Sequence, residues 1–446
     1  MAPTPRHKIS LLVFIAFFCQ AGYAHALSLL EAYEAALEHD PVYRAAVHEN
    51  EAGQQAEAIG LAGLLPNLAF THNQNKNAGV QDRGLGAGME SLNFEGQVTS
   101  LTLRQPLLNL EAVAGYNQGK AKANSSSARF TGHSQQLVVR LVEAYVDTLL
   151  AQDRLKLAGK QKDSLAELKQ VNEHMLRKGE GTTTDVLETQ SKYALAQARV
   201  IEAQDELEVA QLKLEAIIGK KISHLDRLSD QFSAMAIQIP DYDSWYALAL
   251  ERNAELVTQR HNVSSGKEEI KKSQAGHVPR VDLVGSLTRN SRGSFITQNQ
   301  EFQFGSIGVE VNVPLYAGGR VNAVTAQAKA NHARAEADLD AATDKVLVEL
   351  RKQYKLLISS IKRIESLQLA VESANLLVHA TEKSIRGGIR INLDLLDAQQ
   401  QLFTVQRDLA EARYNHLLAY LRLQLAAGTL VLEDLRKIAG FFSAHR

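Results

Sequence analysis

The stretch Arg386-Gly-Gly-Ile-Arg-Ile-Asn-Leu-Asp-Leu-Leu-Asp-Ala-Gln399 decides the fold, because almost the same stretch occurs earlier in the chain. It aligns without a gap on Arg177-Lys-Gly-Glu-Gly-Thr-Thr-Thr-Asp-Val-Leu-Glu-Thr-Gln190, 209 residues upstream. The pattern that follows each copy continues at this offset as far as Gly219 and Gly428. A supersecondary unit has therefore been duplicated, and we expect two structurally equivalent halves.

Each copy predicts a tight turn followed by a long helix. Glycine pairs, Gly179 with Gly181 and Gly387 with Gly388, end the preceding helix, and the Thr, Asn and Asp residues after them cap free backbone N–H groups. Apolar and small residues then recur in steps of three and four, which is the spacing of a coiled-coil seam. In the second copy the seam is Leu395, Ala398, Leu402, Val405, Leu409, Ala412, His416, Ala419 and Leu423; in the first it is Val186, Thr189, Tyr193, Ala196, Val200, Ala203, Leu207, Ala210 and Leu214.

The duplication extends over the rest of the chain. Ala36-Leu-Glu-His-Asp40 matches Ala249-Leu-Glu-Arg-Asn253 at an offset of 213 residues. We therefore expect a first repeat over residues 27–242, a second repeat over residues 243–428 and a C-terminal tail over residues 429–446. Residues 220–243 and the tail are predicted to form short irregular belts around the helices.

Each repeat also predicts a β-hairpin, over about 68–104 and about 281–313. Apolar residues alternate along these segments, and a loop rich in Gly, Asn and Ser separates the two strands of each pair. The apolar phase shifts near Gly305, which predicts a bulge, and Pro106 and Pro314 are expected to close the hairpins. The strands have about the ten residues of a membrane-spanning barrel strand, although a soluble β-sandwich remains an alternative.

The longest predicted elements are helices over about 115–219 and about 319–428, each a pair joined by the glycine turn. At 1.5 Å per residue, the first helix of each pair is on the order of 90–100 Å long. One globular core cannot bury such rods, so they must pack on one another or on other subunits. Tyr145 and Tyr354, again 209 residues apart, are predicted to be equivalent packing residues.

Residues 1–26 predict a signal peptide. Arg6 and Lys8 precede an apolar run, and Ala24-His-Ala26 is a small-residue cleavage site, so we expect cleavage before Leu27. The apolar run is too short for a membrane anchor. Cys19, the single cysteine, would be removed, and Phe18 before it argues against a lipid attachment site.

Composition and motifs exclude several functions. Charged residues make up 22% of the chain and are well mixed, so no basic stripe for a nucleic acid is present. His48-Glu-Asn-Glu-Ala lacks the second histidine of a zinc-protease helix, and no Gly-x-Ser-x-Gly or phosphate-binding loop occurs. We therefore predict no enzyme activity, no catalytic residues, no metal and no cofactor. A soluble periplasmic coiled-coil scaffold remains an alternative of another class.

The ordered set of motifs resembles the TolC family of outer-membrane efflux and secretion channels. The resemblance is carried by Asp185-Val-Leu-Glu-Thr-Gln190, Asp394-Leu-Leu-Asp-Ala-Gln399 and Val313-Pro-Leu-Tyr-Ala-Gly-Gly-Arg320, and it covers nearly all of Leu27–Gly428. Within the family the chain is most similar to the branch without a lipid anchor that serves type I secretion of proteases.

The resemblance implies an α+β membrane protein in the cell outer membrane that extends into the periplasm. In this fold three identical chains build a twelve-stranded β-barrel joined to a periplasmic α-helical barrel. The implied partners are outer-membrane lipid, a periplasmic membrane fusion (adaptor) protein and an inner-membrane ABC transporter. Export of proteins and efflux of small molecules use the same conduit, so an efflux pump remains the alternative.

The resemblance also implies site residues. Asp394 and Asp397, three apart on one helical face, correspond to the family's acidic ring at the periplasmic aperture. Six carboxylates in a trimer would attract cations and exclude anions; taken alone, the pair also fits a helix N-terminal charge pair. Asp185 and Arg390 correspond to the link that closes the aperture. Ile385 stands where a family member has a tyrosine, so closure through a tyrosine hydrogen bond is not expected.

Overall fold

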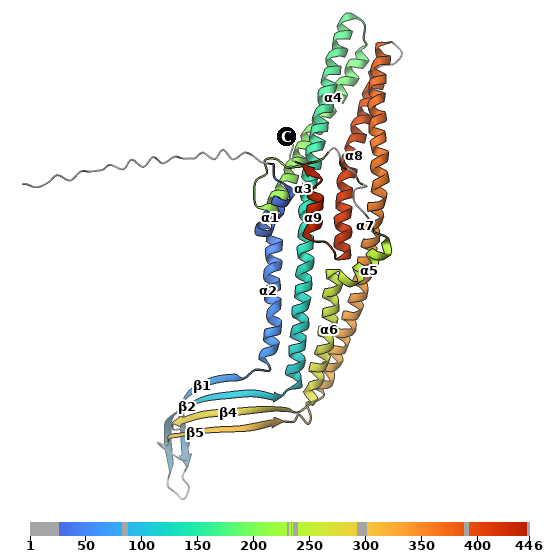
Figure 1. Ribbon diagram of the computed structural model, residues 1–446. Coiled ribbons are helices and arrows are strands. Elements are labelled where there is room, and N and C mark those ends of the chain that lie inside the picture. The colour runs from blue at the N-terminus through green and yellow to red at the C-terminus, as the bar shows by residue number, and fades with distance from the viewer. Residues whose placement is uncertain are drawn as a thin grey trace, which may run out of the picture.

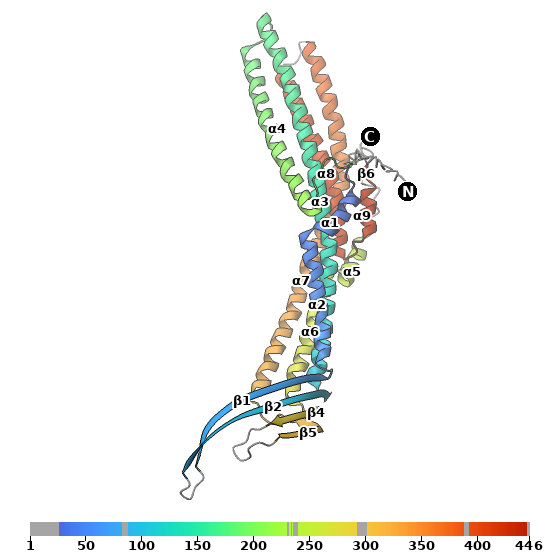
Figure 2. The same ribbon diagram turned by 90° about the vertical axis from the view of Figure 1, so that its left-hand side faces the viewer.

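The computed structural model describes residues 26–82, 88–229, 232, 234, 240–291, 301–387 and 392–443. A small β-sheet forms one end of an elongated molecule, and two helical hairpins reach the opposite end (Figures 1 and 2). In each half, two shorter helices and a β-hairpin precede a long helix and its return helix. The two equivalent halves that the duplicated stretch predicts are therefore present. No helix in the described ranges is both long and apolar enough to cross a membrane.

The shorter helices begin at side-chain caps. Helix α1 (Leu29–His39) starts at a capping box between Ser28 and Glu31, and α2 (Pro41–Ala62) starts at Asp40 with proline in its first turn. Their counterparts in the second half are α5 (Tyr242–Arg252) and α6 (Ala254–Gln274), which is followed by a short 3₁₀ turn at Ala275–His277.

The two hairpins join into one antiparallel sheet with strand order β1-β2-β4-β5. Its strands are β1 (Asn67–Asp82), β2 (Met89–Leu108), β4 (Arg280–Ser291) and β5 (Glu301–Asn312). The predicted bulge at Gly305 is wrong, because β4 and β5 pair without a register shift there. The irregularity lies instead between Pro106 and Leu108, inside β2, so Pro106 does not end its strand.

The long helices are α3 (Leu110–Lys178), α4 (Thr183–Ile218), α7 (Arg320–Arg386) and α8 (Asn392–Ala427). With 69 residues, α3 is about 100 Å long. It starts five residues before the predicted position, because the Asn109 side chain accepts from the Ala112 N–H and caps it. The predicted seams are confirmed in their core: Thr189, Ala196, Ala203, Ala210 and Leu214 are buried in α4, and Leu395, Ala398, Val405, Ala412, His416, Ala419 and Leu423 in α8.

The main apolar core lies at mid-height, where both halves meet α1 and the C-terminal residues. Tyr145 is fully buried there, and Tyr354 packs against the same cluster. The predicted irregular belts are partly wrong. Residues Leu432–Ala439 form helix α9, whose Leu435 and Ile438 enter the core, and β6 (Phe442–Ser443) pairs with β3 (Arg227–Leu228).

Candidate aperture at the helical tips

The turn between α3 and α4 depends on glycine. Gly179 adopts a left-handed conformation with φ of 77°, which a residue with a Cβ rarely takes. Its N–H donates to the carbonyl of Leu176 at 3.0 Å, and the N–H of Glu180 donates to that of Met175 at 3.0 Å. A Cβ at Gly181 would lie 3.1 Å from the Cβ of Met175. Helix α3 therefore ends in a tight glycine turn directly before α4 starts.

Asp185 has a structural task in this turn. Its carboxylate accepts hydrogen bonds from the Thr182 N–H at 3.2 Å and the Thr182 hydroxyl at 2.6 Å, which completes a capping box at the start of α4. Its backbone carbonyl accepts from the Thr189 hydroxyl at 2.7 Å. Arg390, its expected partner, lies outside the described residues, so the closing link stays a prediction.

The end of α7 differs from that of α3. Gly387 ends the helix with φ of −85°, so this position does not need the left-handed conformation, and Gly388 lies outside the described residues. Ile385, two residues earlier, packs on a small apolar cluster formed by Val378, Leu395 and Ala398. The position at which a family member has a tyrosine is thus held by apolar contact.

The two aspartates expected at the aperture lie at the start of α8. Asp394 is half-buried in its first turn, and Asp397 is exposed. Asp397 forms an ion pair with Lys192 of α4, with 3.0 Å between Oδ1 and Nζ. Sequence reasoning missed Lys192, although one signal was present: at the repeat offset it matches Gln401, so a cation stands in one copy only. This ion pair offsets one of the two negative charges of Asp394 and Asp397 in each chain.

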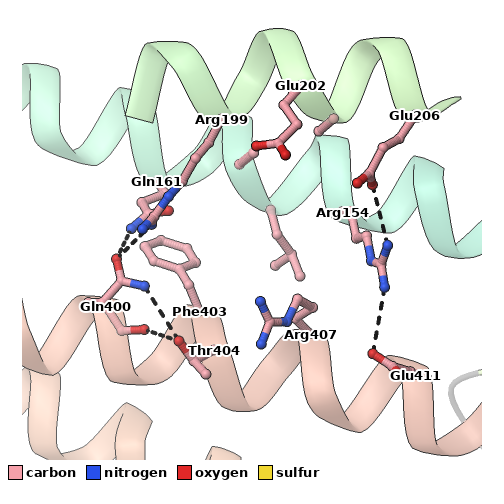
Figure 3. Close-up of a pocket in the computed structure, with 13 residues that line it drawn as sticks. Arg154, Gln161, Arg199, Glu202, Glu206, Gln400, Phe403, Thr404, Arg407 and Glu411 are labelled. Atoms are coloured by element: carbon pink, nitrogen blue, oxygen red, sulfur yellow. Dashed lines mark hydrogen bonds and ion pairs between the residues drawn. The ribbon is translucent and has the colours of Figure 1, made fainter. Parts of the chain in front are cut away.

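Farther along the helices, α3, α4 and α8 line an open pocket of about 430 Å³ (Figure 3). Arg154 of α3 reaches carboxylates on two different helices across it. Its guanidinium lies 3.3 Å from Glu206 of α4 and 3.6 Å from Glu411 of α8. The Arg154 Nε is buried, and no hydrogen-bond partner for it is found in the part of the chain that the structure describes. Arg154 therefore bridges the two helical hairpins through a single side chain.

Gln400 of α8 ties the same hairpins together a second time (Figure 3). Its side-chain oxygen accepts from the Gln161 amide of α3 and, at 3.2 Å, from the Arg199 guanidinium of α4. Arg407, by contrast, pairs only with the neighbouring Asp408 at 2.9 Å among the contacts of the described residues. Gln400 thus adds a second polar contact between the hairpins, whereas Arg407 does not.

The family model described as outer membrane efflux protein matches residues 32–220 and, a second time, residues 245–429. The chain belongs to this family. Its two matched segments fall on the two halves that the duplicated stretch defines, and the predicted resemblance to the TolC family is confirmed.

Two relatives of this outer membrane efflux protein extend over nearly its whole length. It is 40% identical to the alkaline protease secretion protein AprF of Pseudomonas aeruginosa, over 94% of this chain and 88% of that protein. It is 37% identical to the proteases secretion protein PrtF of Dickeya chrysanthemi, over 98% of this chain and 95% of that protein. Both sequence identities extend over nearly the whole chain, so these two proteins and this chain belong to one family.

The crystal structure of the outer membrane protein VceC from Vibrio cholerae shares the fold, with a TM-score of 0.76, 18% identity, and coverage of 90% of this chain and 96% of that one. This outer membrane efflux protein is therefore an outer-membrane channel protein with the duplicated strand and helix architecture of TolC.

Proposed function

We propose that this chain is the exit channel of a tripartite export system and that its cargo is protein. The cargo class is inferred from sequence identity to two proteins that are named for the secretion of proteases. The identity is 40% to one and 37% to the other, over nearly the whole chain. The proposed partners are a periplasmic membrane fusion (adaptor) protein and an inner-membrane ABC transporter, which would select the cargo. The chain itself has no catalytic task in this proposal.

The sheet has one face suited to lipid. Residues that pair across the strands share a face, and on one face the register brings together large apolar side chains from all four strands. We call this face the apolar belt; it comprises Leu68, Phe70, Leu101, Leu103, Val281, Leu283, Leu287, Ile307, Val309 and Val311. Most of these are exposed, Ile307 by 80%. From Val281 to Leu287 the belt covers six residue steps of β4, roughly 20 Å at about 3.4 Å per residue, which is of the same order as the ~25 Å apolar band of outer-membrane barrels.

Behind the apolar belt, the opposite face of the sheet is mostly polar. Arg104 donates to Asp282 at 2.6 Å and to Glu310 at 2.9 Å, and the hydroxyls of Ser286 and Ser306 are 2.8 Å apart. Such a face suits a water-filled lumen. Four strands cannot close a barrel by themselves, since about eight are needed. Twelve strands from three chains would pair the free edges of β1 and β5 between copies.

The flanks of the helical part also favour a ring of identical chains. Contacts run from α4 to α3, from α3 to α8 and from α8 to α7, so α4 and α7 lie on the two flanks of the helical hairpins, as the upper part of Figure 2 shows. One face of α4 presents exposed carboxylates between exposed apolar residues, and one face of α7 presents exposed lysines between exposed apolar residues. On α4 these are Ile201, Asp205, Glu208 and Leu212; on α7 they are Val348, Lys355, Lys362, Leu369 and Leu376. The carboxylates of α4 in one copy can pair with the lysines of α7 in the next copy, while the apolar residues that flank both sets pack on one another. Such a head-to-tail contact closes into a ring.

The helical tips provide the gate in this proposal. Asp394 and Asp397 of three chains would form the acidic ring, with Lys192 moderating its charge through the 3.0 Å contact to Asp397. The predicted link between Asp185 and Arg390 would hold the ring closed. Because Asp185 already caps α4 through Thr182, breaking the link must leave this cap in place. A rotation of the hairpins is compatible with that requirement, whereas unwinding of α4 is not.

The test compares the culture supernatant of a strain that lacks this chain with that of its parent. We expect one or a few proteins to disappear and to return when the gene is restored, with no change in susceptibility to drugs and dyes. An unchanged supernatant with increased drug susceptibility would overturn the cargo class in favour of efflux. A separate extraction experiment tests the channel itself. If salt without detergent releases the protein from membranes, the result would support a soluble scaffold and overturn the channel.

A further inference from the structure

The apolar belt ends part-way along the sheet, and beyond its outer edge large apolar side chains lie on the opposite face. Phe302 and Phe304 stand near the start of β5, at the end of the sheet that lies away from the helices. Because β4 and β5 pair without a shift, both residues share a face with Ser306, whose hydroxyl contacts that of Ser286. They do not share the face of Ile307 in the belt. Both rings are about half exposed, Phe302 by 48% and Phe304 by 55%. The two phenylalanines therefore lie on the face that lines the lumen in the proposed barrel.

The residues that surround the two rings on this face are uncharged. The register places one row of residues across the four strands at the level of Phe302 and a second row at the level of Phe304. The first row is Phe302, Asn290, Val98 and Asn73, and the second is Phe304, Thr288, Ser100 and Thr71. Charged and titratable side chains of the same strand segments lie on the outward face instead. These are His72, Lys76, Glu95, Arg289 and Glu301, of which Arg289 pairs with Glu301 and Lys76 with Glu95 at 3.9 Å.

We propose that Val98, Phe302 and Phe304, here called the apolar collar, contact the apolar side chains of an unfolded polypeptide as it leaves the channel. The proposal rests on the proposed function, which places three copies of the chain around one lumen and gives the channel a protein cargo. Each copy contributes two phenylalanine rings and one valine side chain, so the collar surrounds the lumen just beyond the apolar belt.

The width of the lumen brings a polypeptide in transit close to the collar. Twelve strands that are about 4.8 Å apart and tilted by about 40° close into a barrel roughly 24 Å across between opposite backbones. Phenylalanine rings that project from facing walls narrow this width toward the ~10–12 Å diameter of a helix with its side chains. A polypeptide that passes this level therefore comes within contact distance of the rings.

The chemistry of the two rows suits a polypeptide better than a charged small molecule. A charged ligand that leaves bulk water needs a counter-charge, and neither row supplies one. Asn73 and Asn290 carry amides that both donate and accept hydrogen bonds, as do the peptide groups of a passing chain. Apolar contact is non-directional and depends on the area removed from water, so the rings can contact many different sequences. Such a surface holds a moving chain weakly and without a fixed register.

Single-channel recording in a planar bilayer tests the collar with two synthetic peptides. Both are unfolded chains of glycine, serine and asparagine; one carries leucines at regular intervals, and the other has serine in their place. Each peptide is added on the barrel side, so that it reaches the collar without passing the aperture. We expect the leucine peptide to block the current about tenfold longer than the serine peptide. This ratio corresponds to about 1.4 kcal/mol, which fits the partial burial of one leucine side chain.

Variants of the channel assign this difference to the collar. Phe302→Ser combined with Phe304→Ser should bring the two block times to within about twofold of each other, because the apolar area of the rings is lost. Phe302→Leu combined with Phe304→Leu should keep the difference, since leucine remains apolar. Gln303→Ser is the matched control, because Gln303 lies between the two rings in β5 on the outward face, and it should leave the ratio of the natural channel unchanged.

The outcomes separate the collar from the channel itself. Equal block times for the two peptides in the natural channel, or a ratio that the double serine variant leaves unchanged, would overturn the collar while the channel stands. Absence of any conductance would overturn the channel, and the collar with it.

Discussion

Gly119 allows the close contact between α2 and α3 to be tested with a matched control. A Cβ placed on Gly119 would lie 2.2 Å from the carbonyl oxygen of Ala56 and 3.0 Å from its carbonyl carbon, both in the backbone of α2. Ordinary contact begins at 3.4 Å, so the helices would have to separate by about 1.2 Å at this point. Gly159 lies on the same helix, and nothing lies within 4 Å of a Cβ built there.

The expected difference in unfolding temperature follows from comparing Gly119→Ala with Gly159→Ala. Both substitutions gain about 1 kcal/mol because alanine favours the helix over glycine. Only Gly119→Ala meets the clash, which costs about 1–3 kcal/mol, towards the upper end because a backbone carbonyl cannot move aside as a side chain can. With an unfolding entropy of about 2.1 cal/mol/K per residue, a chain of this length loses about 1 °C of unfolding temperature per kcal/mol. We therefore expect Gly119→Ala to unfold about 3 °C below Gly159→Ala.

The assay is thermal unfolding of the detergent-solubilised protein, followed by circular dichroism of the helical signal. One scan rate must be used throughout, because unfolding of a large membrane assembly is governed by its rate. The difference between the two variants removes the shared gain in helix propensity and isolates the contact with α2. If Gly119→Ala unfolds at or above the temperature of Gly159→Ala, the reasoning is refuted: the spacing of α2 and α3 would then adjust without cost.

Three further predictions concern the gate and the core. Arg154→Gln removes the bridge between the hairpins and should raise the resting single-channel conductance in a planar bilayer. Arg407→Gln is the control and should leave the conductance unchanged, since among the described residues it loses an ion pair with its neighbour alone. Equal conductance of the two variants would show that the Arg154 bridge does not hold the channel closed. Asp394→Asn combined with Asp397→Asn should weaken block of the channel by multivalent cations, and unchanged block would remove these residues from the acidic ring. Burial lowers the pKa of His416 from 6.5 to about 4, so the unfolded chain takes up the proton first, and stability should fall by about 3 kcal/mol per chain as the pH drops from 6.5 to 4. His416→Leu should flatten that part of the pH profile of thermal unfolding; an unchanged profile would show that His416 is not responsible.

The predictions that held are those that rest on local or repeated patterns. The seam in α8 could be found because helical geometry brings residues three and four apart onto one face, wherever the helix lies. The hairpins could be found because strands alternate with a period of two. The phase shift near Gly305 was visible as well, but its interpretation as a bulge was wrong. Only the pairing of β5 with β4 shows that the register is continuous and that apolar residues change face there.

The C-terminal tail shows what local reasoning overlooked. Leu432, Leu435 and Ile438 follow at intervals of three, a helical signal in a segment too short to stand out from irregular structure. This helix is stabilised by burial in the core and has little support from its own length. This short helix therefore forms because the core offers an apolar surface on which Leu435 and Ile438 are buried.

By itself, the sequence determined the duplication, the order of helices and strands, the membership of the family and the two aspartates that open α8. These follow from periodicity and motifs, which depend on neighbours along the chain. Only the tertiary structure brought Lys192 to Asp397, Arg154 between two hairpins, and Leu27 beside Asp226. Each of these contacts joins residues that are dozens to hundreds of positions apart, and a side chain finds such a partner only when packing fixes the rotation and height of whole helices.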